Sequence, residues 1–211
     1  MKRLHALSEE PTAPERWIGF APESEVDVRQ DGDREWKTLR TLTYHGKSDT
    51  FEVPLHQATD FASVPRVFAW LIPVYGRYTK AAILHDYLCR VAVEADVISR
   101  ADADGIFRQA MRTLEVAFLR RWIMWTGVRL GALATAKGRE KWLGHSWQVV
   151  PVVLVALPLV MPAAGVIIVS LAGFYLVERV AWLALLVGKH RRRSAGKPAK
   201  QVNEPRLQLK L

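Results

Sequence analysis

The chain has 211 residues with a formal net charge of +9, and hydrophobic residues make up 50% of it. This length accommodates one domain of ordinary size together with an appendage. The positive charge would suggest nucleic acid as a partner, but much of it flanks a single apolar block, so nucleic-acid binding is not expected. One cysteine, Cys89, excludes an intramolecular disulfide and a metal cage built from cysteines of one chain, and it fits a reducing compartment.

The start of the chain, residues 1–16, is polar, contains two prolines and shows no periodicity, so it is predicted to be a flexible arm. It lacks an apolar run of the length that a signal peptide needs, and the soluble part is therefore expected to stay inside the cell. Short alternating runs at residues 25–28, 36–44 and 50–53 then predict strands, with Asp31-Gly32 as a turn signal between the first two. Together these runs indicate a small antiparallel sheet.

Three helical stretches are predicted after the strands. Residues 78–93 carry apolar side chains at helical spacing, and Ser99 with Asp102 forms a capping-box pattern at the start of the next helix. A third amphipathic stretch, residues 120–143, is expected to pack on the domain or to lie at a membrane surface. The predicted fold class is therefore α+β, with a small antiparallel sheet packed on two or three helices over residues 17–145.

An apolar block follows this domain. Residues 149–177 contain no charged side chain, and this stretch exceeds the roughly 20 residues needed to cross about 30 Å of hydrocarbon. We therefore predict a membrane segment over residues 146–188, with the lipid bilayer as a partner, and a basic tail over residues 189–211.

Prolines and a glycine interrupt the block and leave two topologies open. The favoured one is a transmembrane helical hairpin that turns at residues 162–165 and keeps both basic flanks on the cytoplasmic side. The alternative is a single kinked span over residues 157–177, which leaves Glu178 and Arg179 at the membrane interface.

Three sequence blocks in the soluble part carry a family resemblance. They are Thr-Asp-Phe-Ala-Ser-Val-Pro-Arg at residues 59–66, Ala-Ala-Ile-Leu-His-Asp-Tyr-Leu at residues 81–88 and Ala-Asp-Gly-Ile-Phe-Arg-Gln-Ala-Met at residues 103–111. In this order and spacing the blocks resemble the domain-of-unknown-function family numbered 1353, found in phages, prophages and bacteria, over about residues 17–131. The chain departs from the family where His56-Gln57-Ala58 replaces a glycine and an aromatic residue.

The resemblance implies domain boundaries, candidate residues and a phage or prophage origin. The apolar block, its basic flanks and the lack of a signal-peptide run lead us to expect a place in the bacterial inner membrane, with the soluble domain in the cytoplasm. The resemblance implies no reaction, because the family has no established activity. Candidate site residues must therefore be found from their chemistry.

Two polar residues fall on predicted apolar helix faces. His85 shares a face with Ala81 and Leu88, and Asp104 precedes Phe107 by three residues, so both are expected to point toward the core. A buried carboxylate needs a partner, and His85 and Asp60 are the natural candidates for Asp104.

This set, Asp60, His85 and Asp104, supports two function hypotheses. The favoured one is a membrane-anchored accessory or interaction module with a possible protein partner, in which the three residues form a structural network. The alternative is a metal-dependent hydrolase, in which they bind a divalent metal that activates water, or work as acid and base. Asp86 is expected to form an exposed pair with Arg90.

Overall fold

The structure is a computed structural model, and it describes residues 17–33, 35–61, 64–65, 68–140, 142–194 and 205. The arm predicted over residues 1–16 lies outside the described residues, as does the predicted tail after Ser194 apart from Pro205. The architecture is α+β, as the sequence predicts.

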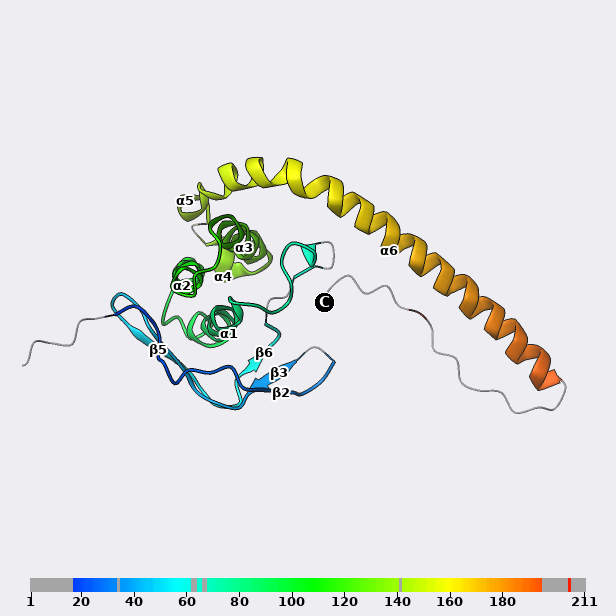
Figure 1. Ribbon diagram of the computed structural model, residues 1–211, viewed down its shortest axis with the longest axis horizontal. Helices are drawn as coiled ribbons and strands as arrows, with labels where there is room; N and C mark the ends of the chain where they lie inside the picture. Colours follow the sequence, from blue (N-terminus) through cyan, green and yellow to red (C-terminus); the bar gives the residue numbers. More distant parts are fainter. Residues whose placement is uncertain are drawn as a thin grey trace, which may run out of the picture.

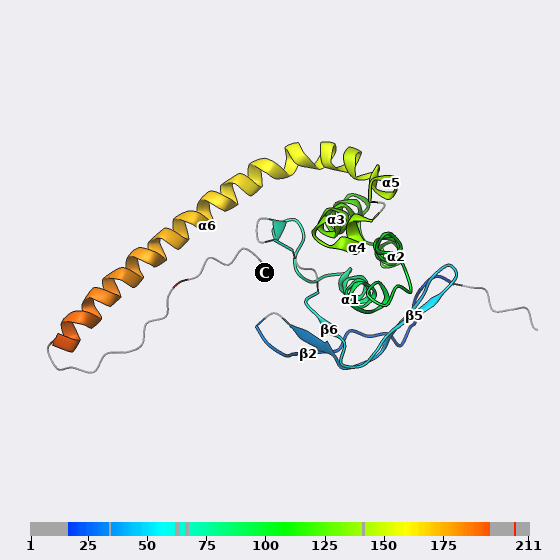
Figure 2. The same cartoon turned by 180° about the vertical axis from the view of Figure 1, so that it is seen from behind.

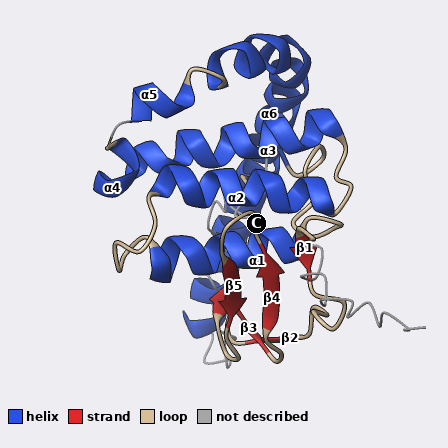
Figure 3. Ribbon diagram, turned by 90° about the vertical axis from the view of Figure 1, so that its left-hand side faces the viewer, coloured by secondary structure: helices blue, strands red, loops and turns tan. Residues whose placement is uncertain are grey.

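The strands form two small antiparallel sheets instead of one. The first sheet has the order β1-β4-β5, with β1 at Gly19–Phe20, β4 at Leu42–His45 and β5 at Thr50–Val53. The second has the order β2-β3-β6, with β2 at Val28–Gln30, β3 at Trp36–Thr38 and β6 at Ala58–Thr59. Both sheets lie at the same end of the domain (Figure 3).

The strand predicted over residues 36–44 is therefore two strands, β3 and β4, separated by a bend. The Thr38 hydroxyl donates to the carbonyl of Pro54 at 2.8 Å and accepts from the amide of Gln57 at 2.9 Å, which fixes the end of β3. After the bend, Leu42 and Tyr44 are each 1% exposed and alternate with less buried residues, as expected for a strand with one face on the core.

The helices stack on the sheets in layers, with α1 nearest the strands and α2 and α3 beyond it (Figure 3). Helix α1 spans Thr79–Tyr87 and continues as a π-helical segment, η2, at Leu88–Ala92. Helix α2 spans Arg100–Thr113 and begins with the predicted capping box, in which the Ser99 hydroxyl accepts from the Asp102 amide at 3.1 Å. Helix α3 spans Phe118–Gly131.

The long helix predicted over residues 120–143 is interrupted. After α3 come a 3₁₀ turn, η3, at Ala132–Ala134 and two short helices, α4 at Ala136–Arg139 and α5 at Trp142–Ser146. The break occurs at Thr135, whose extended backbone cannot continue a helix and whose hydroxyl accepts from the Gly138 amide at 3.1 Å as the cap of α4.

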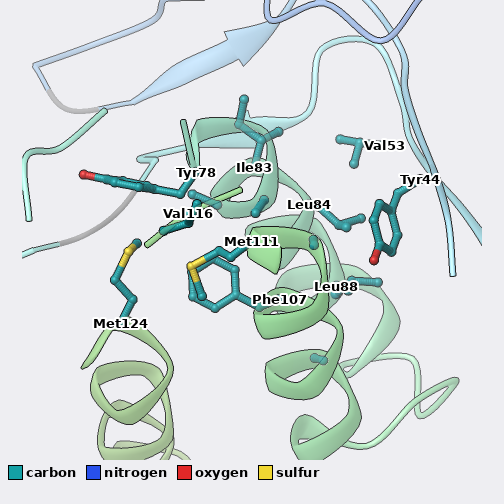
Figure 4. Packing of buried hydrophobic residues seen from close by; sticks show 14 of the residues in the cluster. Tyr44, Val53, Tyr78, Ile83, Leu84, Leu88, Phe107, Met111, Val116 and Met124 are labelled. Carbon is teal, nitrogen blue, oxygen red and sulfur yellow. The ribbon is translucent and has the colours of Figure 1, made fainter. Parts of the chain in front are cut away.

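The core lies between the β1-β4-β5 sheet and the three helices (Figure 4). Tyr44 and Val53 from the strands meet Leu84 from α1 and Leu88 from η2, and Met111 extends the cluster from α2. Each of these side chains is at most 1% exposed. This packing fixes α1 against α2, and the candidate site is built on these two helices.

The predicted hairpin is replaced by one continuous helix, α6, at Val149–Ser194. Pro158 and Pro162 lie inside this helix. Each proline removes one backbone hydrogen bond, but this loss does not by itself end a helix. At 1.5 Å per residue the helix is roughly 70 Å long. It curves over α3 and then leaves the domain, as two opposite views show (Figures 1 and 2).

Candidate functional site

A buried carboxylate on α2, Asp104, is the centre of the first polar cluster. Its side chain is completely buried, because the capping box at Ser99 sets a register that turns Ala103, Asp104 and Phe107 toward the core. His85 of α1 faces it, with 2.7 Å between His85 Nε2 and Asp104 Oδ1. An ionised carboxylate only accepts hydrogen bonds, so Nε2 carries the proton and donates.

Two arginines complete the coordination of this carboxylate. Arg100, one turn earlier on α2, donates from Nε to Oδ1 of Asp104 at 3.1 Å, and Arg129 of α3 donates from Nη1 to Oδ2 at 3.0 Å. Arg129 is 2% exposed and also donates to the Ser146 hydroxyl, from Nη2 at 2.6 Å and from Nε at 3.0 Å. The cluster therefore joins α1, α2, α3 and the segment that precedes α6.

Sequence reasoning missed Arg129 and Ser146. The available signal was the spacing of four between Trp125 and Arg129, which places both on one face of α3, and both are buried there. An arginine among apolar positions predicts a buried acidic partner. That partner is Asp104.

The charge balance keeps Asp104 ionised. Burial alone would raise the pKa of its carboxyl group, but the hydrogen bond and charge of His85, the charge of Arg100 and the hydrogen bond of Arg129 hold the pKa below its ordinary value. Arg100 and Arg129 bring two positive charges to the single negative charge of Asp104. A divalent cation at this position would be repelled by both guanidinium groups.

Cys89 also lies close to the imidazole of His85. Its Sγ lies 3.4 Å from His85 Nε2, and His85, Cys89 and Asp104 place potential ligand atoms within 4.8 Å of one another. Histidine, thiolate and carboxylate together suit zinc. Burial, the largest cause, raises the pKa of the Cys89 thiol to about 12, so it keeps its proton at neutral pH. As it stands, the cluster is a closed hydrogen-bonded network.

Asp60 belongs to a second cluster, on the side of α1 that faces β6. Asp86 Oδ2 accepts from the Thr59 hydroxyl at 2.5 Å and from the Asp60 amide at 3.3 Å. Asp60 Oδ1 lies 3.6 Å from Arg90 Nη2. Consecutive residues of a helix point about 100° apart, which is why His85 faces α2 while Asp86 faces the strand.

Asp86 differs from its expected role as the exposed partner of Arg90. It is partly buried and bonded to Thr59, which is itself fully buried. Burial, and then the charge of Asp60, raises the pKa of the Asp86 carboxyl group to about 7. The structure thus brings His85 and Asp104 together, and it places Asp60 with Asp86; the hypothesis of a metal bound by Asp60, His85 and Asp104 stays a prediction.

Residues 36–128 match the family model described as "Protein of unknown function (DUF1353)". This region runs from β3 into α3 and contains Asp60, His85 and Asp104, and it supports the family resemblance of the α+β domain. Neither the curated proteins nor the solved structures contain a match to the chain.

Proposed function

We propose that the protein is a membrane-anchored accessory or interaction module of phage or prophage type, held in the bilayer by α6. The observation that carries the proposal is the exposure of an apolar helix. Residues Val149–Val187 are long and apolar enough to cross a membrane, and the most apolar window has a mean hydropathy of 2.7 with 11% of it buried inside the protein. Large apolar side chains such as Leu154 and Val169 are 69% and 73% exposed. Such a surface requires lipid or another apolar partner.

We propose a single span over residues 157–177, the alternative to the hairpin. At 1.5 Å per residue these residues measure roughly 31 Å, which matches a hydrocarbon thickness of about 30 Å. Directly after them, the guanidinium of Arg179 lies over the rings of Tyr175 at 5.9 Å and Trp182 at 5.1 Å. Aromatic rings beside a cation are typical of the membrane interface, so this group supports an interface near Arg179.

The membrane is the bacterial inner membrane, with the soluble domain in the cytoplasm. This orientation rests on the free thiol of Cys89, which suits a reducing compartment. A single span puts the two basic flanks on opposite sides of the membrane. The hairpin would have kept both flanks on the cytoplasmic side, so the distribution of basic residues no longer supports the orientation.

The membrane proposal is tested by fractionation of cells that express the full chain, followed by an alkaline wash of the membranes. The wild-type chain is expected to stay in the washed pellet. Replacing Val166 and Val169 with arginine, at about 3 kcal/mol each near the bilayer centre, is expected to release it. A matched variant, Thr41→Arg with Ser48→Arg, adds the same charge to the exposed surface of the domain and should stay in the pellet. A wild-type chain in the soluble fraction would overturn the proposal.

The closed network at Asp104 favours an interaction module over an enzyme. Both carboxylate oxygens of Asp104 are occupied, and the two arginines oppose a divalent cation. A metal-dependent hydrolase is the second candidate, because His85, Cys89 and Asp104 lie close enough to share a metal ion.

Metal content of the purified full chain separates the two candidates. The full chain is required because Ser146, which bonds Arg129, belongs to the segment before α6. Stoichiometric zinc or manganese that is lost in His85→Ala and kept in His45→Ala would favour the hydrolase. Equal, substoichiometric metal in all three proteins is the result expected for the interaction module.

A further inference from the structure

A cationic hollow lies between α2 and α3, and none of its lining residues belongs to either polar cluster. It has a volume of about 400 Å³. Its lining residues are Arg108, Gln109, Arg112, Phe118, Arg121 and Trp122. Three of the six are arginines and none is acidic.

The positive charge in the hollow has no acidic partner among the described residues. Within the part of the chain that the structure describes, no carboxylate lies within 4.0 Å of the guanidinium nitrogens of Arg108, Arg112 or Arg121. Burial, and then the charge of Arg121, lowers the pKa of Arg108, as expected where cations are crowded together. Holding the three guanidinium groups close together lowers the stability of the folded protein, and a bound anion would offset this cost.

Aromatic rings hold two of the three guanidinium groups in place. The guanidinium of Arg108 lies 4.4 Å from the ring centre of Trp122 and 4.9 Å from that of Trp125, and Arg121 lies 5.6 Å from Phe118. Stacked guanidinium groups keep their edges available for hydrogen bonds, and these edges match the oxygens of a phosphate group.

The hollow adjoins the start of the membrane helix. Arg108 donates from Nη1 to Oε1 of Gln148 at 3.0 Å, and Gln148 immediately precedes α6. Phe118 and Trp147 are 68% and 69% exposed, as is typical of side chains that enter the interfacial region of a bilayer. The first turns of α6 and the hollow thus lie on the same side of the molecule, the side from which the anchor leaves the domain.

We propose that this hollow binds the phosphate group of an anionic phospholipid headgroup. Arg112 and Arg121 are the contacting cations, and Arg108, stacked on tryptophan rings, is a third cation of the site. The occupant follows from position, because a headgroup is the phosphate-bearing molecule that a bilayer-inserted α6 brings to this surface. The inference rests on the proposed membrane function. A free phosphate compound shares the chemistry, and the experiment separates it from lipid.

The test is native mass spectrometry of the full chain, purified in detergent, with added phosphatidylglycerol or phosphatidylcholine of the same acyl chains. The wild-type chain is expected to retain phosphatidylglycerol in preference. The double variant Arg112→Gln with Arg121→Gln is expected to raise the apparent Kd for phosphatidylglycerol by about 25-fold, from about fivefold per cation near an anionic surface. Binding of phosphatidylcholine should not change.

A matched double variant, Arg29→Gln with Arg120→Gln, removes the same charge from exposed positions that do not line the hollow. Equal loss of phosphatidylglycerol in both double variants, or equal retention of the two lipids by the wild type, would overturn the proposal. Displacement of the lipid by millimolar inorganic phosphate would assign the hollow to a soluble phosphate and overturn the lipid assignment. Because binding is measured in detergent, its failure is distinct from failure of the chain to pellet with membranes.

Discussion

Replacing Asp104 with asparagine is the most informative single change in the buried network. The amide keeps the size of the side chain but supplies one oxygen and one nitrogen. Oδ1 accepts from His85 and Arg100, and Oδ2 accepts from Arg129, so the nitrogen must face a donor whichever way the amide turns. Arg129, 2% exposed, also loses its counter-charge. Removing one partner of a buried ion pair costs about 3–5 kcal/mol, a large part of the 5–15 kcal/mol that stabilises a typical domain.

The assay is urea unfolding of the full chain in a mild detergent, followed by tryptophan fluorescence. Asp104→Asn is expected to lower the free energy of unfolding by about 3–5 kcal/mol. Asp102→Asn, an isosteric change at the exposed cap of the same helix, is expected to cost about 1 kcal/mol or less. A cost within 1 kcal/mol for Asp104→Asn would refute the view that this network holds the helices together, and retained stability with loss of bound metal would favour the hydrolase.

The other predictions concern pH, the junction with α6 and topology. The folded-state pKa of Asp86 is raised to about 7 from 3.8, so this group's contribution to stability falls as pH rises from about 4 to 7. Asp86→Asn should remove that fall. The measurement is the difference in the free energy of unfolding between the wild type and the variant across this pH range. Ser146→Ala leaves two N–H groups of Arg129 without their acceptor and should cost about 1.5–3 kcal/mol in the same urea assay. A single span puts Pro205 and Ser48 on opposite sides of the inner membrane. In a cysteine-free chain, a membrane-impermeant maleimide added to cells with a permeable outer membrane should therefore label Pro205→Cys and spare Ser48→Cys. Labelling of neither position would favour the hairpin.

Asp104 shows the opposite dependence on pH from Asp86. Its folded-state pKa lies below its ordinary value, so its contribution is present above about pH 4 and is lost as pH falls through the folded-state pKa. The two carboxylates therefore separate in titration: acid removes the contribution of Asp104 and relieves the cost of Asp86. A wild-type chain whose stability rises steadily between pH 4 and 7 by the same amount as Asp86→Asn would contradict the assignment.

Local signals in the sequence predicted local structure well. The Ser99 capping box and the apolar stripe over residues 78–93 follow from contacts within one turn, and both occur in the structure. The prediction of one strand over residues 36–44 was wrong. The strand is divided at Thr38 by hydrogen bonds to Pro54 and Gln57, and the alternating pattern within one strand gives no sign of these distant partners.

The site was predicted in part for the same reason. The helical faces of His85 and Asp104 are set by spacing within each helix, so their inward direction could be read from the sequence. Their meeting at 2.7 Å and the separate position of Asp60 depend on how α1, α2 and β6 pack together. Arg129 lies 25 residues from Asp104 on another helix, beyond any local pattern.

The position of Arg129 also connects the α+β domain to α6. The family match ends at residue 128, so Arg129 and Ser146 lie beyond the matched region, while His85, Arg100 and Asp104 lie within it. Asp104 thus receives one guanidinium from its own helix and another from the region that leads to α6. Since Arg129 bonds Ser146, three residues before α6 begins, a displacement of α6 reaches the Asp104 carboxylate through only two side chains. A buried ion pair that breaks at a cost of several kcal/mol makes this junction a stiff connection between the domain and α6.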